Sequence, residues 1–203
     1  MISETLIIYS RYPEAGKTKT RMIPALGAEG AAQLQRQMTE HTIDTAWKLK
    51  DKRKINIEVH FAGKNEQLMS AWLGKNIKYV PQIAGNLGDK MNSSFTQAFN
   101  MGNKRVVTIG IDCPDLNSDI LNDAFDSLQK HDLVLGVAKD GGYYLIGLNQ
   151  TIPQLFQNID WGTENVLKQT KAIANKLNLQ TYYLTALSDV DRPEDLLVWQ
   201  KYK

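Results

Sequence analysis

The sequence predicts a single α/β domain whose mostly parallel sheet is covered by helices on both faces. Segments with strand-like and helix-like patterns alternate almost throughout the chain, which is typical of parallel sheets. The 203 residues suffice for one such domain, and 42% of them are hydrophobic. No linker rich in proline, glycine or serine divides the chain, so we expect residues 1–203 to form one unit.

Strands are predicted where short apolar runs are rich in β-branched and aromatic residues. The run TLIIY predicts a buried first strand, INIEVHF alternates as a half-buried strand does, and RVVTIGI stops at an aspartate. The predicted strands cover residues 5–9, 55–61, 77–80, 105–111, 133–137, 143–148 and 181–184.

A long helix is expected after the first loop, because Ala31, Leu34 and Met38 recur at intervals of three and four residues. We expect it to begin near Ala28 and to end near residue 50. Two strands joined by a turn that contains Asp-Gly are typical of a hairpin, so AKDGGYYLIG predicts one reversed strand in a mixed sheet. The other predicted helices cover residues 65–72, 87–101, 116–130, 161–177 and 194–200.

Composition and charge exclude several classes of protein and partner. The 14 glycines and 6 prolines exclude collagen-like and low-complexity chains. A formal net charge of +2 gives no strong field for nucleic acid or an acidic membrane surface, so we expect a small partner. No apolar run approaches the ~20 residues that span a bilayer, and the first residues do not resemble a signal peptide. The one cysteine, Cys113, cannot form an internal disulfide, so we expect a soluble cytoplasmic protein. The sequence does not predict its oligomeric state.

A cluster of cations follows the first predicted strand. Arg11, Lys17, Lys19 and Arg21 lie close together in the sequence, and Gly16 provides a bend in the loop that carries them. Lysine offers a point charge and arginine a bidentate fork, which are the two usual ways to hold phosphate oxygens. Ligands of parallel sheets bind beyond the carboxyl ends of the strands, where this loop begins. The loop therefore predicts phosphate binding, with a solvated basic loop as the structural alternative.

The same loop nearly matches the P-loop pattern G-x-x-x-x-G-K-[ST]. The end of the pattern is present as Gly16-Lys17-Thr18, but Arg11 stands where the first glycine is needed. A side chain there obstructs the close backbone approach to phosphate, and the helix is expected to begin near Ala28 rather than at Lys17. We therefore do not expect a P-loop.

An aspartate that ends the strand RVVTIGI is the best candidate for a metal ligand. Asp112 follows this strand, and Pro114 fixes the turn after it. Carboxylate oxygens suit Mg²⁺ and Mn²⁺, and a metal there would bridge the phosphates of a nucleotide. Asp115 is better explained as a turn and cap residue. Asp189 and Asp191, after the last strand, are further candidates, although Asp191 also suits a helix start.

Two other groups of residues are candidates for contacts with substrates. Gln82, Gly85 and Asn86 lie between a strand and a helix, where amides can contact the edge of a nucleobase. Trp161 is a candidate for an acceptor pocket, while Thr163 predicts a helix cap.

The predicted hairpin turn has two interpretations. Asp140 and Gly141 are typical of a tight turn between strands. The glycine pair Gly141-Gly142 beside Tyr143 and Tyr144 also suits the floor of a pocket in which a ring stacks on a ligand.

The order and spacing of these segments resemble a family of short bacterial proteins that are usually named glycosyltransferase or transferase of unknown substrate. The segments are YSRYPEAGKTKTRM, QIAGNLGDKM, TIGIDCPDL, AKDGGYYLIGL, IDWGT and LSDVDRPEDL, and the resemblance covers residues 7–196. It implies the Rossmann-like GT-A fold of the nucleotide-diphospho-sugar transferases. That superfamily also contains the molybdenum-cofactor and phospholactate nucleotidyltransferases.

The resemblance implies roles for residues of the first loop and the central strand. Lys17, Lys19 and Arg21 fall in the loop that holds the triphosphate in related nucleotidyltransferases. Asp112 matches the metal-binding aspartate at the end of the central strand.

Further roles are implied for the later segments. Asp140, Gly141 and Gly142 fall where related enzymes meet the second substrate, and Asp191 falls near their second metal ligand. The chain departs from the family pattern at residues 85–88, where the family reads G-D-L-G and Asn86 replaces the aspartate. It also departs at residues 191–196, where the family reads D-T-P-E-D-L.

From the residues and the resemblance together we expect a metal-dependent transferase that uses a nucleotide-sugar or a nucleoside triphosphate, with Mg²⁺ or Mn²⁺ and a small acceptor. Attack on the anomeric carbon of the sugar is glycosyl transfer, and attack on the α-phosphorus is nucleotidyl transfer with release of pyrophosphate. The family name favours the first and the basic loop favours the second. A P-loop-type ATPase and a non-catalytic nucleotide-binding module are the alternatives. The expected catalytic residues are Asp112, Lys19, Arg21 and Asp140.

Overall fold

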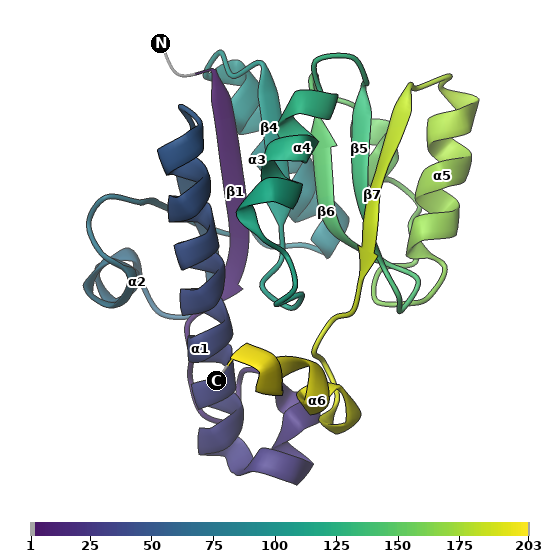
Figure 1. Ribbon diagram of the computed structural model, residues 1–203. Helices are drawn as coiled ribbons and strands as arrows, with labels where there is room; N and C mark the ends of the chain where they lie inside the picture. The colour runs from purple at the N-terminus through teal and green to yellow at the C-terminus, as the bar shows by residue number, and fades with distance from the viewer. Residues whose placement is uncertain (1–2, 203) are drawn as a thin grey trace.

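A seven-stranded mixed sheet forms the centre of the computed structural model, which describes residues 3–202 (Figure 1). The strand order is β3-β2-β1-β4-β6-β5-β7. All neighbours pair in parallel except β6, which is antiparallel to both β4 and β5. The predicted fold class and the predicted hairpin are therefore confirmed. The strands are β1 (Glu4–Arg11), β2 (Asn56–Ala62), β3 (Lys78–Pro81), β4 (Arg105–Ile109), β5 (Leu133–Ala138), β6 (Tyr143–Leu148) and β7 (Thr181–Leu187).

Helices cover both faces of the sheet, which divides the core into two parts. The helices α1 (Ile23–Lys52) and α4 (Ser118–Ser127) pack on one face, and α3 (Leu87–Asn100) and α5 (Val166–Lys176) pack on the other. The helix α2 (Glu66–Leu73) lies beside β3, and α6 (Leu196–Trp199) belongs to the C-terminal segment. Over residues 3–202, no helix combines the length and the apolar character that crossing a membrane requires.

The apolar residues of neighbouring strand positions explain these two layers. Leu6 and Ile8 of β1 face the α1 side, whereas Ile7 faces the α3 side, as the two-residue period of a strand requires. All three are fully buried. Phe125 of α4 and Phe95 of α3 fill the two sides, so each helix layer is held by the apolar face that it turns to the sheet.

The predicted starts of α4 and α5 differ from the structure, whereas that of α1 is close. The helix α1 is assigned from Ile23, but Gly27 has φ 70° and ψ 169°, so its regular part begins after Gly27, close to the predicted start. The helix α4 begins only at Ser118 because the Asn117 side chain caps it. The helix α5 begins at Val166 rather than at residue 161, with Thr163 accepting a hydrogen bond from the Asn165 N–H in the preceding turn.

A buried carboxylate anchors the edge of the sheet at which β1 begins. Glu4 is 6% exposed and accepts hydrogen bonds from Arg53 and Arg105. Arg53 also reaches Asp126 at 2.8 Å. Burial alone raises the pKa of Glu4, but the hydrogen bonds and charges of the two arginines outweigh it and lower that pKa. This network ties β1, β4, α1 and α4 together at the edge far from the loops described next.

Candidate functional site

The loop after β1 crosses the carboxyl ends of the strands, and its backbone explains how it does so. Gly16 has φ 76°, a conformation that glycine adopts without strain. Lys19 is also left-handed, at φ 46° and ψ 43°, and it precedes a 3₁₀ turn over Thr20–Met22. Met22 is fully buried and anchors the end of the loop in the core. The loop therefore turns back over the sheet instead of extending into solvent.

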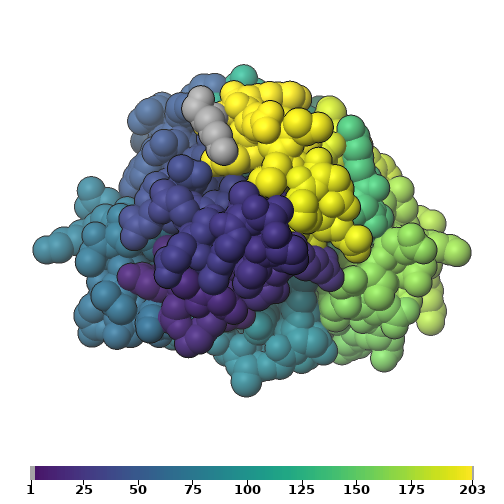
Figure 2. All heavy atoms as spheres, turned by 90° about the horizontal axis from the view of Figure 1, so that it is seen from below, coloured from purple at the N-terminus to yellow at the C-terminus, as the bar shows by residue number. Residues whose placement is uncertain are grey.

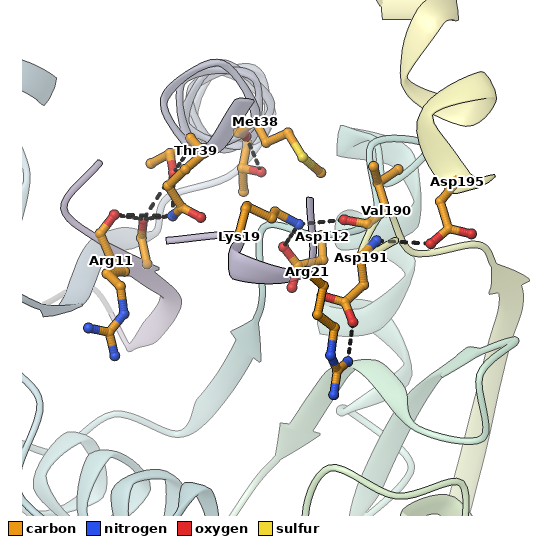
Figure 3. Close-up of polar contacts among 12 residues, drawn as sticks. Arg11, Lys19, Arg21, Met38, Thr39, Asp112, Val190, Asp191 and Asp195 are labelled. Carbon is orange, nitrogen blue, oxygen red and sulfur yellow. Dashed lines mark hydrogen bonds and ion pairs between the residues drawn. The ribbon is translucent and has the colours of Figure 1, made fainter. Parts of the chain in front are cut away.

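Lys19 and Asp112 form the central contact of the candidate site (Figure 3). The Lys19 ammonium lies 2.7 Å from Asp112 Oδ1, and it also donates to the Val190 carbonyl oxygen. The Lys19 side chain is 4% exposed, whereas the Asp112 side chain is 50% exposed. The Val190 N–H donates to the Asp112 carbonyl oxygen at 2.8 Å. Residues far apart in the chain thus meet where β1, β4 and β7 end.

A second ion pair joins the same segments. Arg21 pairs with Asp191, which raises the pKa of the Arg21 guanidinium. Asp195 accepts hydrogen bonds from the N–H groups of Asp191 and Arg192, and so shapes the turn that follows β7. The turn before α6 is therefore capped by Asp195, and the carboxylate of Asp191 is directed to Arg21 (Figure 3).

The C-terminal segment lies across this edge of the sheet. Figure 2 shows it beside the loop that follows β1, in agreement with the contacts of Val190 and Asp191. Tyr202 donates to Asp115, and the rings of Trp199 and Tyr202 pack against His41 of α1. Asp115 therefore binds the C-terminal segment and has no capping role.

Asp189 adds a third carboxylate near Asp112. Burial raises the pKa of Asp189, and the charges of Asp140, Asp195 and Asp112 raise it further. Asp140 and Asp112 thus lie within electrostatic reach of Asp189, from the ends of three different strands. Asp189 is therefore a candidate for the same site as Asp112.

The donor set suits a hard divalent cation that also binds phosphate. Lys19 contacts Oδ1 of Asp112 and Arg21 contacts Oδ2 of Asp191, so each carboxylate keeps a second oxygen. Within residues 3–202, no three His, Cys, Asp or Glu side chains converge as a ready-made metal site. Mg²⁺ is typically held by one or two carboxylates together with substrate phosphates and water, so such a trio is not required. Asp112 and Asp191 remain the predicted ligands.

Another group of charges occupies the β1–β2 side of the loop. Glu14 pairs with both Lys17 and Lys64, and the Lys64 ammonium lies 2.6 Å from Glu14 Oε2. Neither Lys64 nor Glu14 is a predicted site residue. The one signal for Lys64 is the glycine before it, close to the end of a predicted strand, and in the structure Gly63 and Lys64 both have positive φ. Arg11 ends β1 and points away from Lys19 and Asp112 (Figure 3).

The structure excludes a P-loop. No helix begins at Lys17, which pairs with Glu14 in a turn. The Thr18 hydroxyl is buried and donates to the Glu14 carbonyl oxygen, so it does not face a nucleotide. The alternative of a P-loop-type ATPase is therefore rejected.

The predicted base-reading residues lie at the start of α3. Asn86 caps this helix in a reciprocal capping box with Asp89, both hydrogen bonds being 3.0 Å long. Gly85 has φ 119°, and a Cβ there would lie 2.6 Å from Asp89 Oδ2. Gln82 donates to the His60 carbonyl oxygen at 2.9 Å. All three have structural roles, and contact with a nucleobase stays a prediction.

The turn between β5 and β6 packs against the segment before α5. Asp140 accepts a hydrogen bond from the Gly142 N–H at 2.9 Å. Gly141 has φ 93°, and a Cβ there would lie 2.5 Å from the Glu164 carbonyl oxygen. The two halves of the predicted acceptor region are thus brought together.

The aromatic residues of this region divide into two groups. Trp161 packs against Gly88 of α3 and meets the Tyr143 ring edge-on, at a centroid distance of 6.4 Å. Tyr144 is 7% exposed, packs on Gly136 and donates to a β7 carbonyl oxygen at 2.9 Å. The ring and the hydroxyl of Tyr144 are thus used in the core, and its contact with an acceptor stays a prediction.

Comparisons with known proteins place the chain in a family. Residues 42–163, more than half of the chain, match the family described as "Uncharacterized protein conserved in bacteria (DUF2064)". A crystal structure from Desulfovibrio desulfuricans G20, assigned as a nucleotide-diphospho-sugar transferase, is 30% identical. The match covers 98% of this chain and 87% of that one, with a TM-score of 0.91. No curated protein matches.

Two more distant structures share the fold. One is a 4-diphosphocytidyl-2C-methyl-D-erythritol synthase from Anaerococcus prevotii DSM 20548, at 12% identity, with 99% and 96% of the two chains covered and a TM-score of 0.66. The other is Rv0371c from Mycobacterium tuberculosis H37Rv in complex with manganese, at 14% identity, with 99% and 100% covered and a TM-score of 0.56. The fold that the sequence predicted is thereby confirmed.

Proposed function

Since this chain belongs to the DUF2064 family, we propose that it is a metal-dependent transferase whose substrate is a nucleotide. Its fold is that of transferases that use nucleotides, and the 30% identical neighbour is assigned as one of them. We further propose nucleotidyl transfer as the reaction, with release of pyrophosphate.

The observation that carries the proposal is the meeting of Lys19 with Asp112 at the carboxyl ends of β1 and β4. In parallel sheets, ligands bind at this edge. A buried cation beside a half-exposed carboxylate offers one group for phosphate oxygens and another for a divalent cation. Arg21 and Asp191 add a second cation and a second carboxylate at the same edge, and here the cation is the more exposed partner.

In this proposal Mg²⁺ or Mn²⁺ would be held by Asp112 and Asp191, and when bound it would neutralise phosphate charge and orient the leaving group. Lys19 and Arg21 hold the phosphate oxygens and stabilise the charge that grows on the departing pyrophosphate. An acceptor oxygen attacks the α-phosphorus in line as the bond to the β-phosphate breaks. Asp140 accepts a hydrogen bond from the acceptor, beside Gly141, Gly142, Tyr143 and Trp161.

Glycosyl transfer is the second candidate, and the name of the 30% identical neighbour favours it. In that reaction the acceptor attacks the anomeric carbon, and a nucleoside diphosphate leaves. The cations of the first loop favour the nucleotidyl reaction instead, because Lys19 and Arg21 at the site, with Lys17 in the same loop, suit a longer polyphosphate.

A thermal-shift panel tests the proposal. Nucleoside triphosphates and UDP-, GDP- and dTDP-sugars are compared with and without Mn²⁺ on the wild type and on Asp112→Asn. Because a ligand of the native state raises the melting temperature by mass action, we expect a Mn²⁺-dependent shift with a triphosphate that Asp112→Asn loses. A shift with sugar nucleotides alone would favour glycosyl transfer. An equal shift in wild type and Asp112→Asn would favour a non-catalytic binding module, and no shift at millimolar ligand would refute a nucleotide substrate.

A further inference from the structure

Two lysines from different loops converge on one carboxylate beside the candidate site. Glu14 and Lys17 belong to the loop after β1, and Lys64 follows β2. The Lys64 ammonium lies 2.6 Å from Glu14 Oε2, while Lys17 pairs with Glu14 Oε1. Lysine binds phosphate as a point charge, so two ammonium groups that share one carboxylate can also share one phosphate group.

The position of Lys64 is set by the backbone. Ala62 pairs with Arg11 in the sheet, and the Tyr12 N–H donates to the Ala62 carbonyl oxygen at 2.9 Å. Gly63 and Lys64 then turn the chain with φ values of 75° and 53°. A left-handed conformation is uncommon for lysine, and here it follows the pairing of β2 with β1 that ends at Ala62 and Tyr12. The backbone of Lys64 therefore lies beside the start of the loop that carries Glu14 and Lys17.

The contacts of Glu14 are of the kind that a stronger anion can replace. Hydrogen bonds from Lys17 and Lys64 lower the pKa of Glu14, so it is ionised at neutral pH. The lysine side chains are 68% and 43% exposed, and exposed ion pairs contribute little to stability. A polyphosphate carries several charges and would compete well for the same two lysines.

We propose that Lys64 and Lys17 bind the distal phosphates of a polyphosphate ligand, and that Glu14 is an internal competitor for that place. The inference rests on the proposed function, because it extends the phosphate site of Lys19 and Arg21. Lys17 and Lys19 are two residues apart, so their Cα atoms lie within about 7 Å, which a triphosphate can span. Arg11, which is in no ion pair among residues 3–202, adds positive charge at the same edge.

The assignment predicts effects of opposite sign for two variants. Calorimetric titration with inorganic tripolyphosphate, at one fixed low salt concentration, gives the dissociation constant of each variant. Lys64→Met removes a ligand of the distal phosphates, and we expect two- to fivefold weaker binding, roughly the contribution of one exposed ion pair. Glu14→Gln removes the competitor, and we expect binding to become tighter by a similar factor.

Matched controls separate the local effect from net charge. Lys75→Met and Asp51→Asn change the net charge by the same amounts as Lys64→Met and Glu14→Gln. Lys75 precedes β3 and Asp51 lies in the last turn of α1. Both are exposed near the amino ends of the strands, away from the first loop. We expect each control to bind tripolyphosphate as the wild type does. Melting temperatures of all variants verify that they are folded.

Three results would overturn the inference. They are equal affinities of Lys64→Met and Lys75→Met, a Glu14→Gln variant that binds no more tightly than Asp51→Asn, and a wild type that does not bind tripolyphosphate. The proposed function is tested by a different experiment, which compares Mn²⁺-dependent nucleotide binding by the wild type and by Asp112→Asn. Either proposal can therefore be refuted without the other.

Discussion

Removing the Lys19 ammonium and the Asp112 carboxylate together should destabilise the ligand-free protein less than the two single removals add up to. The Lys19 side chain is 4% exposed, and its ammonium lies 2.7 Å from Asp112 Oδ1. Asp112→Ala leaves this buried charge with one carbonyl acceptor. One-sided loss of a buried ion pair costs about 3–5 kcal/mol, and we expect about 3 kcal/mol because Asp112 is half exposed.

Removal of the Lys19 ammonium alone should lower the free energy of unfolding by less than removal of the Asp112 carboxylate. Lys19→Met leaves a carboxylate that water reaches, so we expect a loss of about 1–2 kcal/mol. The double variant leaves no uncompensated charge, and we expect it to lose about 2–3 kcal/mol. The coupling free energy is then about 2 kcal/mol.

Urea unfolding, followed by tryptophan fluorescence and extrapolated linearly, measures each free energy of unfolding. The control cycle uses Lys52 and Asp119, an exposed pair at 2.7 Å, for which we expect a coupling below about 1 kcal/mol. A Lys19–Asp112 coupling as small as that of the control would contradict the assignment of a buried, mutually neutralised pair.

Three further predictions concern stability and the acceptor region. The pKa of Glu4 is lowered in the folded protein, so its contribution is present above the unfolded pKa of about 4.3 and is lost as the pH falls through the folded pKa. Urea midpoints at pH 7 and pH 3 should therefore differ less for Glu4→Gln than for the wild type, and an equal difference would contradict this reasoning. Tyr144→Phe should lose about 1 kcal/mol of stability, measured by urea unfolding, and should bind nucleotide with wild-type affinity, since its hydroxyl serves the core. Gly141→Ala should lower the melting temperature by several degrees, because its Cβ would lie 2.5 Å from the Glu164 carbonyl oxygen. Gly162→Ala is the control, because Gly162 has a similar φ (82° against 93°) but open space around it. Equal melting temperatures of these two variants would contradict the prediction that the contact with Glu164 causes the loss of stability.

Local patterns in the sequence predict most of the fold. The apolar runs and the three- and four-residue spacings gave all seven strands and the main helices, because each element buries a face whose period is visible in the chain. The starts of α4 and α5 were placed too early. Asn117 ends the preceding turn as a cap, and Trp161 is held by packing against Gly88, a contact between residues far apart in the sequence.

The site was predictable in outline for a different reason. Carboxyl ends of parallel strands meet at one edge, so charged residues after strands, such as Lys19 and Asp112, were expected to meet. Their pairing, however, depends on the left-handed backbone at Lys19. A residue other than glycine rarely adopts this conformation, so it cannot be predicted from the sequence. The pairing of Glu14 with Lys64 depends likewise on a turn that only the folded sheet defines.

The most direct test of the account is a titration of Mn²⁺ followed by electron paramagnetic resonance. The signal of free Mn²⁺ is measured with wild type and with Asp112→Asn, in the presence and absence of a nucleoside triphosphate and against the nucleotide alone. We expect the wild type to bind Mn²⁺ together with the triphosphate, and so to lower the apparent dissociation constant of Mn²⁺ below that of the nucleotide alone, and Asp112→Asn to lose that difference. Identical titrations for the two proteins would contradict the claim that Asp112 holds the metal against the phosphates.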